Sequence, residues 1–462
     1  MASRRPITLD ERGIALPMTV FAMSALSVLV MAYLSMATME PQVSANLNAT
    51  TQAHYLADAG MEWAFDQLAT TSNWSSLFAT STPSVTGLGG AFTVQIRNDT
   101  LAADQAFTGL ATNEVSTSTD GNNIVIVVST GTVNGITRQI QAAVSRTNIP
   151  SFPGAVNEPG VQADTRINGP IGGSVNFKFD GRDYQCSTAG ACNNESDWSL
   201  TSNPMKYGIA TNTGTQTNIG ITYEQNVENG LDNAAKQNNV YGCNESTCGA
   251  SPPASTAAVT QGLSAVQGTS SLDLPTLDSF VANIGSHPST TILQSTQACP
   301  MVLTGSSTST PSTSPTLTNG GGSCTVNQSL DLGSRTNPKL VYFKGDIDTS
   351  SLFTGLTLNG NIQGAGILVV EDGDLTINGT FRWDGIVIVT GSYVGTGFAN
   401  SSNVTINGAL VSAEHVANEA SGFYEVRVRD VTSLLIRASK QNVDLAQLGV
   451  KQLYRVLSWK EI

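Results

Sequence analysis

The feature that most constrains this chain is its start. Residues 1–13 form a polar segment ending in Arg12-Gly13, and the run from Ile14 to Met39 that follows contains no charged residue. A helix crosses a hydrocarbon layer of about 30 Å with about 20 apolar residues, so this run is long enough to span a membrane. No small-residue cleavage site follows the apolar core, as it would in a secretory signal peptide. We therefore expect processing before the run, at Gly13, and a membrane segment that stays on the mature protein.

The helical pattern continues beyond the apolar run, and we predict one long helix over residues 14–70. Pro17 falls in its first turn, where a missing N–H costs little, whereas Pro41 is expected to kink or open the helix. Small residues then recur every three or four positions, which allows close helix approach. These are Ala45, Ala49, Ala53, Ala57, Gly60 and Ala64. Either packing on the chain's own sheet or packing against other subunits explains them.

The residues around Gly13 resemble the class III signal of type IV prepilins, in which a charged leader and a Gly precede an apolar helix. The fifth residue after Gly13 is Met18, where that family usually carries Glu. Its absence is typical of PilX-type minor pilins and GspK-type minor pseudopilins. The segment Ala57-Asp58-Ala59-Gly60-Met61-Glu62 is similar to PilX N-terminal regions, and Tyr454–Ile462 resembles the ending of large PilX-like proteins.

The resemblance implies a maturation route and a set of partners. A prepilin peptidase would cut between Gly13 and Ile14, and the new amino group of Ile14 would be methylated. The leader would stay in the cytoplasm and the bulk of the chain would enter the periplasm, as the three Arg of the leader also favour. The partners would be other pilins or minor pilins and an inner-membrane assembly platform. Without a carboxylate at Met18, a low-copy position at the filament tip is expected.

The predicted fold class combines an α+β region with an all-β region. Residues 71–149 are expected to form an antiparallel sheet on the long helix, because 91–97 alternates and 123–128 is β-branched. Asn134-Gly135 is typical of a tight hairpin turn. The boundary of this region is placed near the Pro-containing segment 147–154.

Residues 150–424 are predicted to form a β-solenoid or β-helix outside the membrane. Apolar runs begin at residues 340, 366, 385 and 408, so successive runs start 19 to 26 residues apart. Long polar loops are expected at 185–335. Residues 425–462, including a helix near 442–449, are expected to cap an open end of the solenoid.

The six cysteines all follow the membrane segment, and their even number suits an oxidising compartment. Pairing of neighbours in sequence gives three disulfides, although six cysteines allow other connectivities. The pairs are Cys186–Cys192, Cys243–Cys248 and Cys299–Cys324. A zinc site is disfavoured because the chain contains no Cys-x-x-Cys.

The composition and the polar motifs argue against several function classes. A net charge of −13 disfavours nucleic acid as a partner. His54, His287 and His415 lie in unrelated contexts, and Glu371-Asp372-Gly373-Asp374 reads as a β-corner more readily than as a calcium loop. Arg382 beside Asp384 is the nearest imitation of a polysaccharide-cleaving site. We expect no catalytic residues, no metal and no cofactor.

The most favoured function is a minor, tip-located type IV pilin that helps to initiate or decorate the pilus. It would act in the inner membrane before assembly and on the extracellular filament afterwards, and its exterior domain would mediate adhesion to a surface or a glycan. One alternative is a minor pseudopilin at the tip of a type II secretion pseudopilus. The other is a membrane-anchored β-helix protein that binds or cleaves a polysaccharide.

Overall fold

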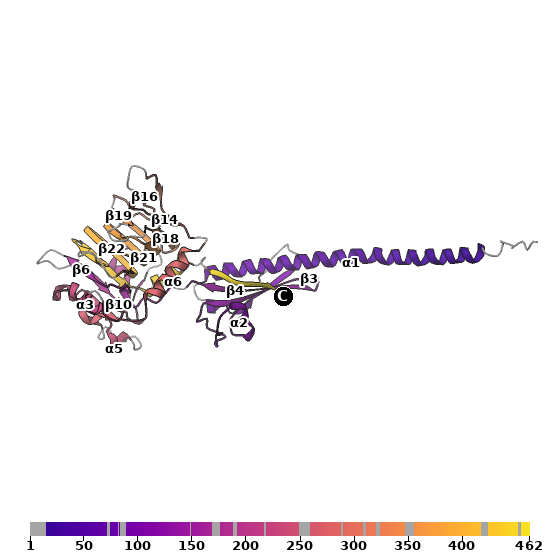
Figure 1. The fold of residues 1–462 in the computed structure, drawn as a ribbon, viewed down its shortest axis with the longest axis horizontal. Helices are drawn as coiled ribbons and strands as arrows, with labels where there is room; N and C mark the ends of the chain where they lie inside the picture. Colours follow the sequence, from indigo (N-terminus) through magenta and orange to yellow (C-terminus); the bar gives the residue numbers. More distant parts are fainter. Residues whose placement is uncertain are drawn as a thin grey trace, which may run out of the picture. The chain divides into compact units, whose positions relative to one another are not determined.

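The chain divides into two compact units. The first comprises residues 1–67, 75–144 and 456–462, and the second comprises residues 68–74 and 145–455. The computed structural model describes residues 15–71, 74–81, 83, 89–147, 149–168, 176–187, 192–216, 219–248, 259–287, 290–307, 311–319, 324–346, 355–416, 424–450 and 454–462. Figure 1 shows both units as a ribbon coloured along the sequence.

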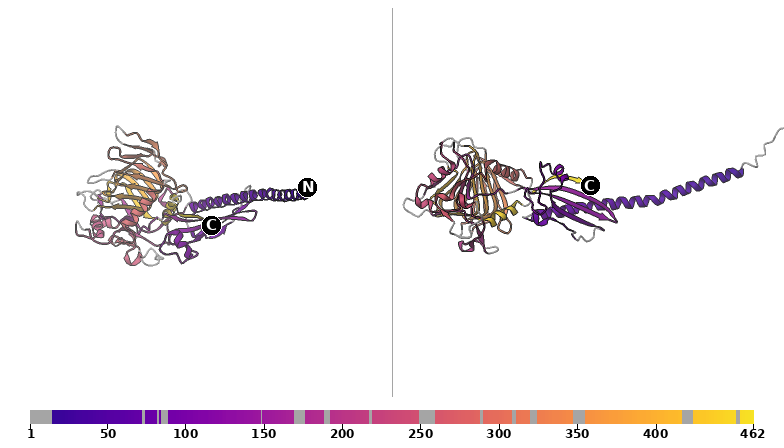
Figure 2. Two further views of the ribbon diagram at one scale, coloured as in Figure 1. Left: turned by 45° about the vertical axis from the view of Figure 1, so that its right-hand side comes forward. Right: turned by 90° about the horizontal axis from the view of Figure 1, so that it is seen from below.

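The first unit is built on one long helix. Its elements, with those that continue into the second unit, are α1 (Ala15–Thr70), η2 (Trp74–Leu77), β1 (Ala79–Ser81), β2 (Ala91–Asn98), α2 (Ala102–Thr108), β3 (Ile124–Val133), β4 (Ile136–Arg146) and β25 (Tyr454–Glu461). The predicted helix is confirmed, but it continues through Pro41 without the expected opening. Figure 2 shows from two further directions that α1 is a single helix.

The sheet of this unit has the order β1-β2-β3-β4-β25. β1 pairs with β2, and β2 pairs with β3, in antiparallel registers, as the alternating sequence predicts. Phe92, for example, lies opposite Gly131. Asn134 and Gly135 join β3 to β4 with φ values of 49° and 81°. Both values are positive, which is the geometry of a tight hairpin and explains why Asn and Gly occupy these positions.

The second half of α1 packs on this sheet through small side chains. A Cβ added at Gly131 of β3 would lie 2.0 Å from the Ala53 carbonyl oxygen of α1, so the two backbones nearly touch. A Cβ at Gly60 of α1 would in turn lie 2.1 Å from Ser129 Oγ. The small residues from 49 to 64 therefore serve the chain's own sheet, while Ala45 is exposed. Buried side chains of this helix face are Ala49, Ala53, Leu56, Ala57, Met61 and Ala64.

The second unit is rich in short strands. From its start to its middle it contains β5 (Gly154–Glu158), β6 (Thr165–Asn168), β7 (Phe177–Asp180), β8 (Tyr184–Cys186), η3 (Glu195–Asp197), β9 (Trp198–Leu200), β10 (Tyr207–Thr211), α3 (Tyr223–Gly230), α4 (Ala234–Gln237), β11 (Val240–Gly242), α5 (Glu245–Cys248), β12 (Thr260–Gln261), η5 (Leu263–Ala265), β13 (Val266–Gly268) and α6 (Leu274–Gly285). From there it continues with β14 (Ile292–Gln294), β15 (Met301–Thr304), β16 (Thr316–Asn319), β17 (Asn327–Ser329), β18 (Lys339–Lys344), β19 (Leu356–Asn359), β20 (Ile362–Glu371), β21 (Leu375–Gly391), β22 (Thr396–Glu414), β23 (Val426–Arg429), β24 (Ser433–Ala438) and α7 (Lys440–Gly449).

Three ladders of parallel strands organise this unit. The first ladder runs β15-β19-β21-β22-β23-β6. The second runs β20-β21-β22-β24-β7-β11. The third runs β14-β18-β20-β21-β22-β5-β10-β13. The long strands β21 and β22 take part in all three ladders, so the chain turns corners within a single strand.

The order of strands along these ladders does not follow the order of the chain. The unit begins with β5, β6 and β7, of which β5 and β7 lie inside their ladders and β6 ends the first one, and it proceeds through β10 and β11 to β13 at one end. After α6, the chain restarts at the other end with β14 and β15. It then advances until β22, β23 and β24 pair in parallel with β5, β6 and β7.

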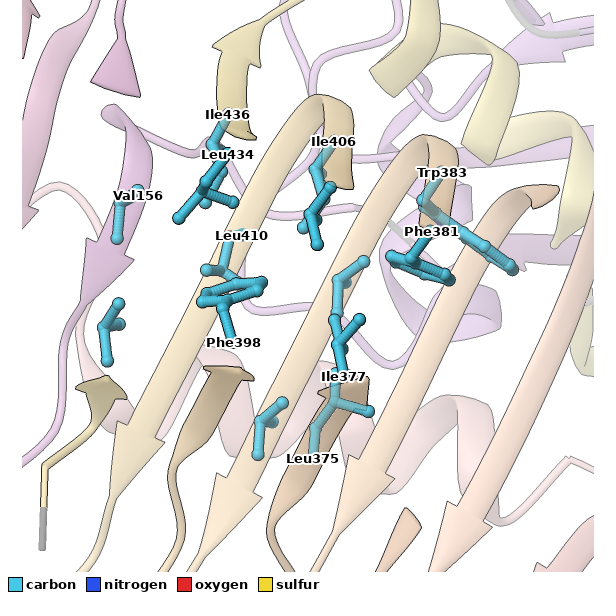
Figure 3. Packing of buried hydrophobic residues seen from close by; sticks show 14 of the residues in the cluster. Val156, Leu375, Ile377, Phe381, Trp383, Phe398, Ile406, Leu410, Leu434 and Ile436 are labelled. Atoms are coloured by element: carbon cyan, nitrogen blue, oxygen red, sulfur yellow. The ribbon is translucent and has the colours of Figure 1, made fainter. Parts of the chain in front are cut away.

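Two hydrophobic cores lie on opposite sides of the third ladder. Leu368, Val387 and Leu410 belong to the interior core, which Figure 3 shows with Phe381, Trp383, Phe398 and Ile406. The neighbouring residues on the same strands, beginning with Ile367, Ile386 and Ala409, face the second core, with Leu277 and Phe280 of α6 and Ala446 of α7. Burial on both faces explains why these strands read as continuous apolar runs rather than as an alternation.

The structure corrects two of the predicted boundaries. The region 185–335 is not a set of polar loops alone, because β10, β11 and β13 extend the ladders and α6 covers the third one. The region 425–462 is not a terminal cap. Its strands β23 and β24 pair on both sides within the ladders, and β25 belongs to the sheet of the first unit. The predicted helix near 442–449 is present as α7.

Candidate functional site: the exposed apolar half of the long helix

Every residue of α1 from Ala15 to Asn48 is exposed. Contiguous apolar surface on this scale marks a membrane or protein interaction site. Among the described residues, α1 is the helix that is long and apolar enough to cross a membrane, with a mean hydropathy of 2.0 in its most apolar stretch. The large apolar side chains that it exposes include Leu16, Met18, Phe21, Met23, Leu26, Leu29, Met31, Leu34, Met36 and Met39.

Four hydroxyl side chains of this segment donate to backbone carbonyl oxygens of the helix itself. Ser24 Oγ donates to the carbonyl oxygen of Phe21 at 2.8 Å, and Ser27 Oγ donates to that of Met23 at 2.8 Å. Thr19 and Thr38 make the same kind of bond three residues back, both at 2.9 Å. These four hydroxyls would therefore enter an apolar environment with their protons already donated, as a membrane or a bundle of helices requires.

The predicted maturation residues lie at the start of this segment. Gly13 and Ile14, the expected cleavage and methylation positions, fall outside the residues that the structure describes. Met18 is in the first turns of α1 with 69% of its side chain exposed. The first acidic residue of α1 is Glu40, more than five helical turns further on. The described half-helix therefore offers no carboxylate to a neighbour at the level of Met18.

The six cysteines form neighbour pairs in the structure. Disulfides join Cys186 to Cys192, Cys243 to Cys248 and Cys299 to Cys324, which are the pairs that the sequence spacing favoured. The first disulfide packs with Trp198 and Tyr184 as a small cluster of its own. That cluster joins the end of β8 to the residues that directly precede η3 and to the start of β9.

The three histidines do not come together. His54 lies on α1 with its Nε2 3.4 Å from an Asp58 oxygen, and His415 Nε2 lies 2.9 Å from an oxygen of Asp278. His287 Nε2 is 3.3 Å from the carbonyl oxygen of Tyr454. Among the described residues, no group of three or more His, Cys, Asp or Glu is arranged to hold a metal ion.

The acidic run 371–374 forms a corner of the ladders. Asp374 Oδ1 accepts the backbone N–H of Gly395 at 2.8 Å, and Asp372 has a φ of 56°. Glu371 accepts the hydroxyl of Tyr342 at 2.6 Å, and it lies 2.9 Å from Lys344 Nζ. These partners fit the corner interpretation made from the sequence. Asp346 Oδ2 accepts the backbone N–H of Gln297 at 3.2 Å, and Asp348 lies outside the described residues.

Arg382 and Asp384 line a pocket in the second unit. Both are on β21, where side chains alternate between the two faces. Phe381 and Trp383 point into the interior core, and Arg382 and Asp384 face outward. Sequence reasoning flagged this pair but missed Arg335, which lies on the same pocket with one nitrogen 3.5 Å from Asp384. No local pattern could have found it, because Arg335 comes from the loop between β17 and β18.

A group of buried acids was also missed. Glu158 and Glu414 are fully buried and Glu425 is 1% exposed, and Asp164 exchanges backbone-to-carboxylate hydrogen bonds with Glu425 at 3.0 and 3.1 Å. Burial raises the pKa of Glu158 to about 8 and raises the pKa values of Glu425 and Asp164. Glu158 and Glu414 end β5 and β22, and Asp164 and Glu425 directly precede β6 and β23, so only the ladder pairing brings them together.

Comparisons with known proteins add little to this geometry. No protein-family model matches the chain, and no curated protein matches it. Among solved structures, the chain matches the crystal structure of the competence-associated pilin ComZ from Thermus thermophilus at 14% identity. The match covers 90% of this chain and 97% of that one with a TM-score of 0.22. At that score, nothing about the fold or the function of this chain follows from the likeness.

Proposed function

We propose that this chain is a minor pilin of the PilX type. In this proposal a prepilin peptidase removes residues 1–13, Ile14 is methylated, and α1 anchors the subunit in the inner membrane. An assembly platform then moves the subunit into a filament, where the exposed half of α1 packs among the helices of other pilins. The observation that supports this most strongly is that half-helix, which is exposed from Ala15 to Asn48 and carries hydroxyls that are already bonded within the helix.

Met18 supports a position at the filament tip. Within an apolar bundle, an amino group left without a carboxylate partner costs several kcal/mol, about what is measured for breaking buried ion pairs. A subunit with Met at this position offers no carboxylate to a neighbouring N-terminus. It is therefore best placed where no neighbour needs one, and in low copy. The size of the second unit, residues 145–455 in large part, favours the same position because so much mass is hard to repeat along a tightly packed fibre.

The second unit would serve as the exterior domain, and we propose that it is a β-solenoid that acts by binding and not by catalysis. The support is the set of three ladders, in which successive segments pair in parallel over many strands. Three disulfides hold local loops of this unit in place. A stiff exterior domain of this kind would suit adhesion to a surface or a glycan.

The substitution Met18→Glu tests the tip assignment. A carboxylate at this position would allow the subunit to neutralise a neighbour's amine inside the fibre, so its copy number per filament should rise several-fold. Met18→Gln, which has nearly the same shape without the charge, is the matched control and should stay at wild-type copy number. Quantitative mass spectrometry of sheared filaments measures both. An unchanged copy number for Met18→Glu, or wild-type subunits spread evenly along the filament, would count against the tip assignment.

A further inference from the structure

A pocket with a volume of about 150 Å³ opens on the outer side of the second ladder. Its floor carries the outward side chains of Gln363, Arg382 and Asp384, from β20 and β21. One wall is the loop 333–336, which contributes hydroxyl groups and a guanidinium. Cys192 and Asn193 also line the pocket.

The walls of the pocket are fixed by contacts outside it. The disulfide to Cys186 holds Cys192, and Arg437 of β24 ties the same loop to the ladder through Glu195 at 2.8 Å. Arg335 Nη1 on the other wall donates to Asn442 Oδ1 of α7 at 2.5 Å. The pocket is therefore a preformed feature of the ladder, α7 and the loop between β8 and β9.

The charge in the pocket is not balanced. Asp384 is 3.5 Å from a nitrogen of Arg335 and 3.6 Å from Arg382 Nη2, so two guanidinium groups share one carboxylate. Asp384 is also occupied by Asn407, whose Nδ2 donates to it at 2.6 Å. Arg382 Nη2 is shielded from water and has no hydrogen-bond acceptor among the described residues. A buried cationic donor without an acceptor is costly, so an anionic ligand that reaches the Arg382 guanidinium would be favoured in this pocket.

We propose that this pocket binds a hexuronate, a six-membered sugar ring that carries one carboxylate. A cavity of about 150 Å³ holds the ring of the sugar, as an engineered apolar cavity of that size binds benzene. The carboxylate and hydroxyls, which more than double the number of non-hydrogen atoms, would extend to the lining side chains and through the open side of the pocket. The ligand's carboxylate would accept from Arg382, and its hydroxyls would pair with Gln363 and the hydroxyls of the loop 333–336. One excess positive charge suits a monoanion, whereas Asp384 would repel a dianion such as phosphate.

The inference deepens the proposed adhesive role and rests on it only for the location of the pocket on a filament. Binding is a property of the purified chain, whereas filament membership is measured in cells. A chain that assembles without binding uronate would therefore refute this inference alone, and one that binds uronate without assembling would refute the filament role alone.

Isothermal titration of the full-length chain in detergent with galacturonate and glucuronate is the direct test. We expect saturable binding of one uronate per chain and at least tenfold weaker binding of galactose and glucose, which lack the carboxylate. Equal affinity for sugar and uronate, no binding of either uronate, or tighter binding of inorganic phosphate would overturn the proposal. Trigalacturonate distinguishes two sources of the same ligand: binding of trimer and monomer assigns a polysaccharide end, and binding of monomer alone assigns a free sugar acid.

Three variants locate the site. Arg382→Gln should weaken uronate binding at least tenfold, whereas Arg429→Gln, which removes the same charge from an exposed position on β23, should leave it unchanged. Thr336→Trp adds bulk at an exposed rim residue, so the fold should tolerate it while the pocket is blocked. Unchanged binding in either folded variant would place the uronate elsewhere and overturn the proposal, so the test still decides if one of the two variants unfolds.

Discussion

At the scale of single residues, the corners between the second and third ladders depend on glycine. Gly366, Gly385 and Gly408 stack on one another in register, with φ values of 119°, 145° and 147°. A Cβ on Gly385 would lie 2.0 Å from the carbonyl oxygen of Gly366, and that atom belongs to backbone that cannot move aside. The corner therefore excludes a side chain on both conformational and steric grounds.

Gly385→Ala tests this corner. Strain and steric conflict together should lower the free energy of unfolding of the second unit by about 3 kcal/mol or more. Gly397→Ala is the matched control, because its added Cβ would meet nothing closer than 3.8 Å and its φ is not in the left-handed region. Urea denaturation followed by tryptophan fluorescence measures both. Equal stability of the two variants would contradict the packing described for the corner.

The buried acids make the second unit sensitive to pH. Glu158 keeps its proton up to a pKa of about 8 in the folded chain but ionises near pH 4.5 when exposed. The folded chain therefore binds more protons than the unfolded chain between these two values. It follows that the free energy of unfolding falls as the pH rises from about 4.5 to about 8.

Glu158→Gln should flatten this pH dependence, because the amide cannot ionise. Denaturation midpoints at pH 5.5 and pH 8 measure the effect, and wild type should lose more stability between them than the variant does. Glu245→Gln, at an exposed position on α5, should behave as wild type. The assignment of a raised pKa to Glu158 would be refuted if wild-type stability rose across this range and Glu158→Gln had the same pH dependence of stability as wild type.

At the scale of elements, α1 performs two tasks with its two halves. Ala53 is fully buried against β3, whereas Ala45 lies two turns earlier on the exposed half. The pattern of small residues therefore runs along both halves of α1. The sheet covers the half that contains Ala53, and no described residue of the first unit covers the half that contains Ala45. The structure shows packing on the chain's own sheet for the small residues from 49 to 64, and packing of Ala45 against other subunits stays a prediction.

Ala53→Leu and Ala45→Leu separate the two tasks. Overpacking at Ala53 should cost the first unit about 1–3 kcal/mol, measured by thermal unfolding of the chain in detergent. Ala45→Leu should leave that unfolding transition unchanged but reduce recovery of the subunit in sheared filaments, because it would disturb close helix approach. Destabilisation by Ala45→Leu, or none by Ala53→Leu, would contradict this division of α1.

What the sequence could predict at this scale follows from which interactions are local. The hairpin at Asn134-Gly135 and the apolar runs of β20, β21 and β22 are local patterns, and the structure contains all of them. The pairing of β22–β24 with β5–β7 joins segments about 250 residues apart, and no local signal encodes it. The region 185–335 was misjudged because its buried residues are spaced too widely among polar ones to give a clear period. Arg335 joins the pocket through the same kind of distant contact.

At the scale of the whole molecule, the second unit is an insertion into the first. The chain leaves the five-stranded sheet after β4 and returns to it only with β25, so β4 and β25 are neighbours in the sheet although almost the entire second unit separates them in sequence. This is why the C-terminal residues could not act as a cap. The sheet that supports α1 is complete only after β25 has been synthesised.

The measurement that tests the filament-subunit account most directly is the intact mass and N-terminal sequence of the chain isolated from membranes, in cells with and without prepilin peptidase. The account predicts an N-terminus at methylated Ile14 when the peptidase is present, and a chain that retains residues 1–13 when it is absent. A start at Met1 or Ala2 in cells that contain the peptidase would contradict the account. In that case, residues 14–39 would be a plain membrane anchor.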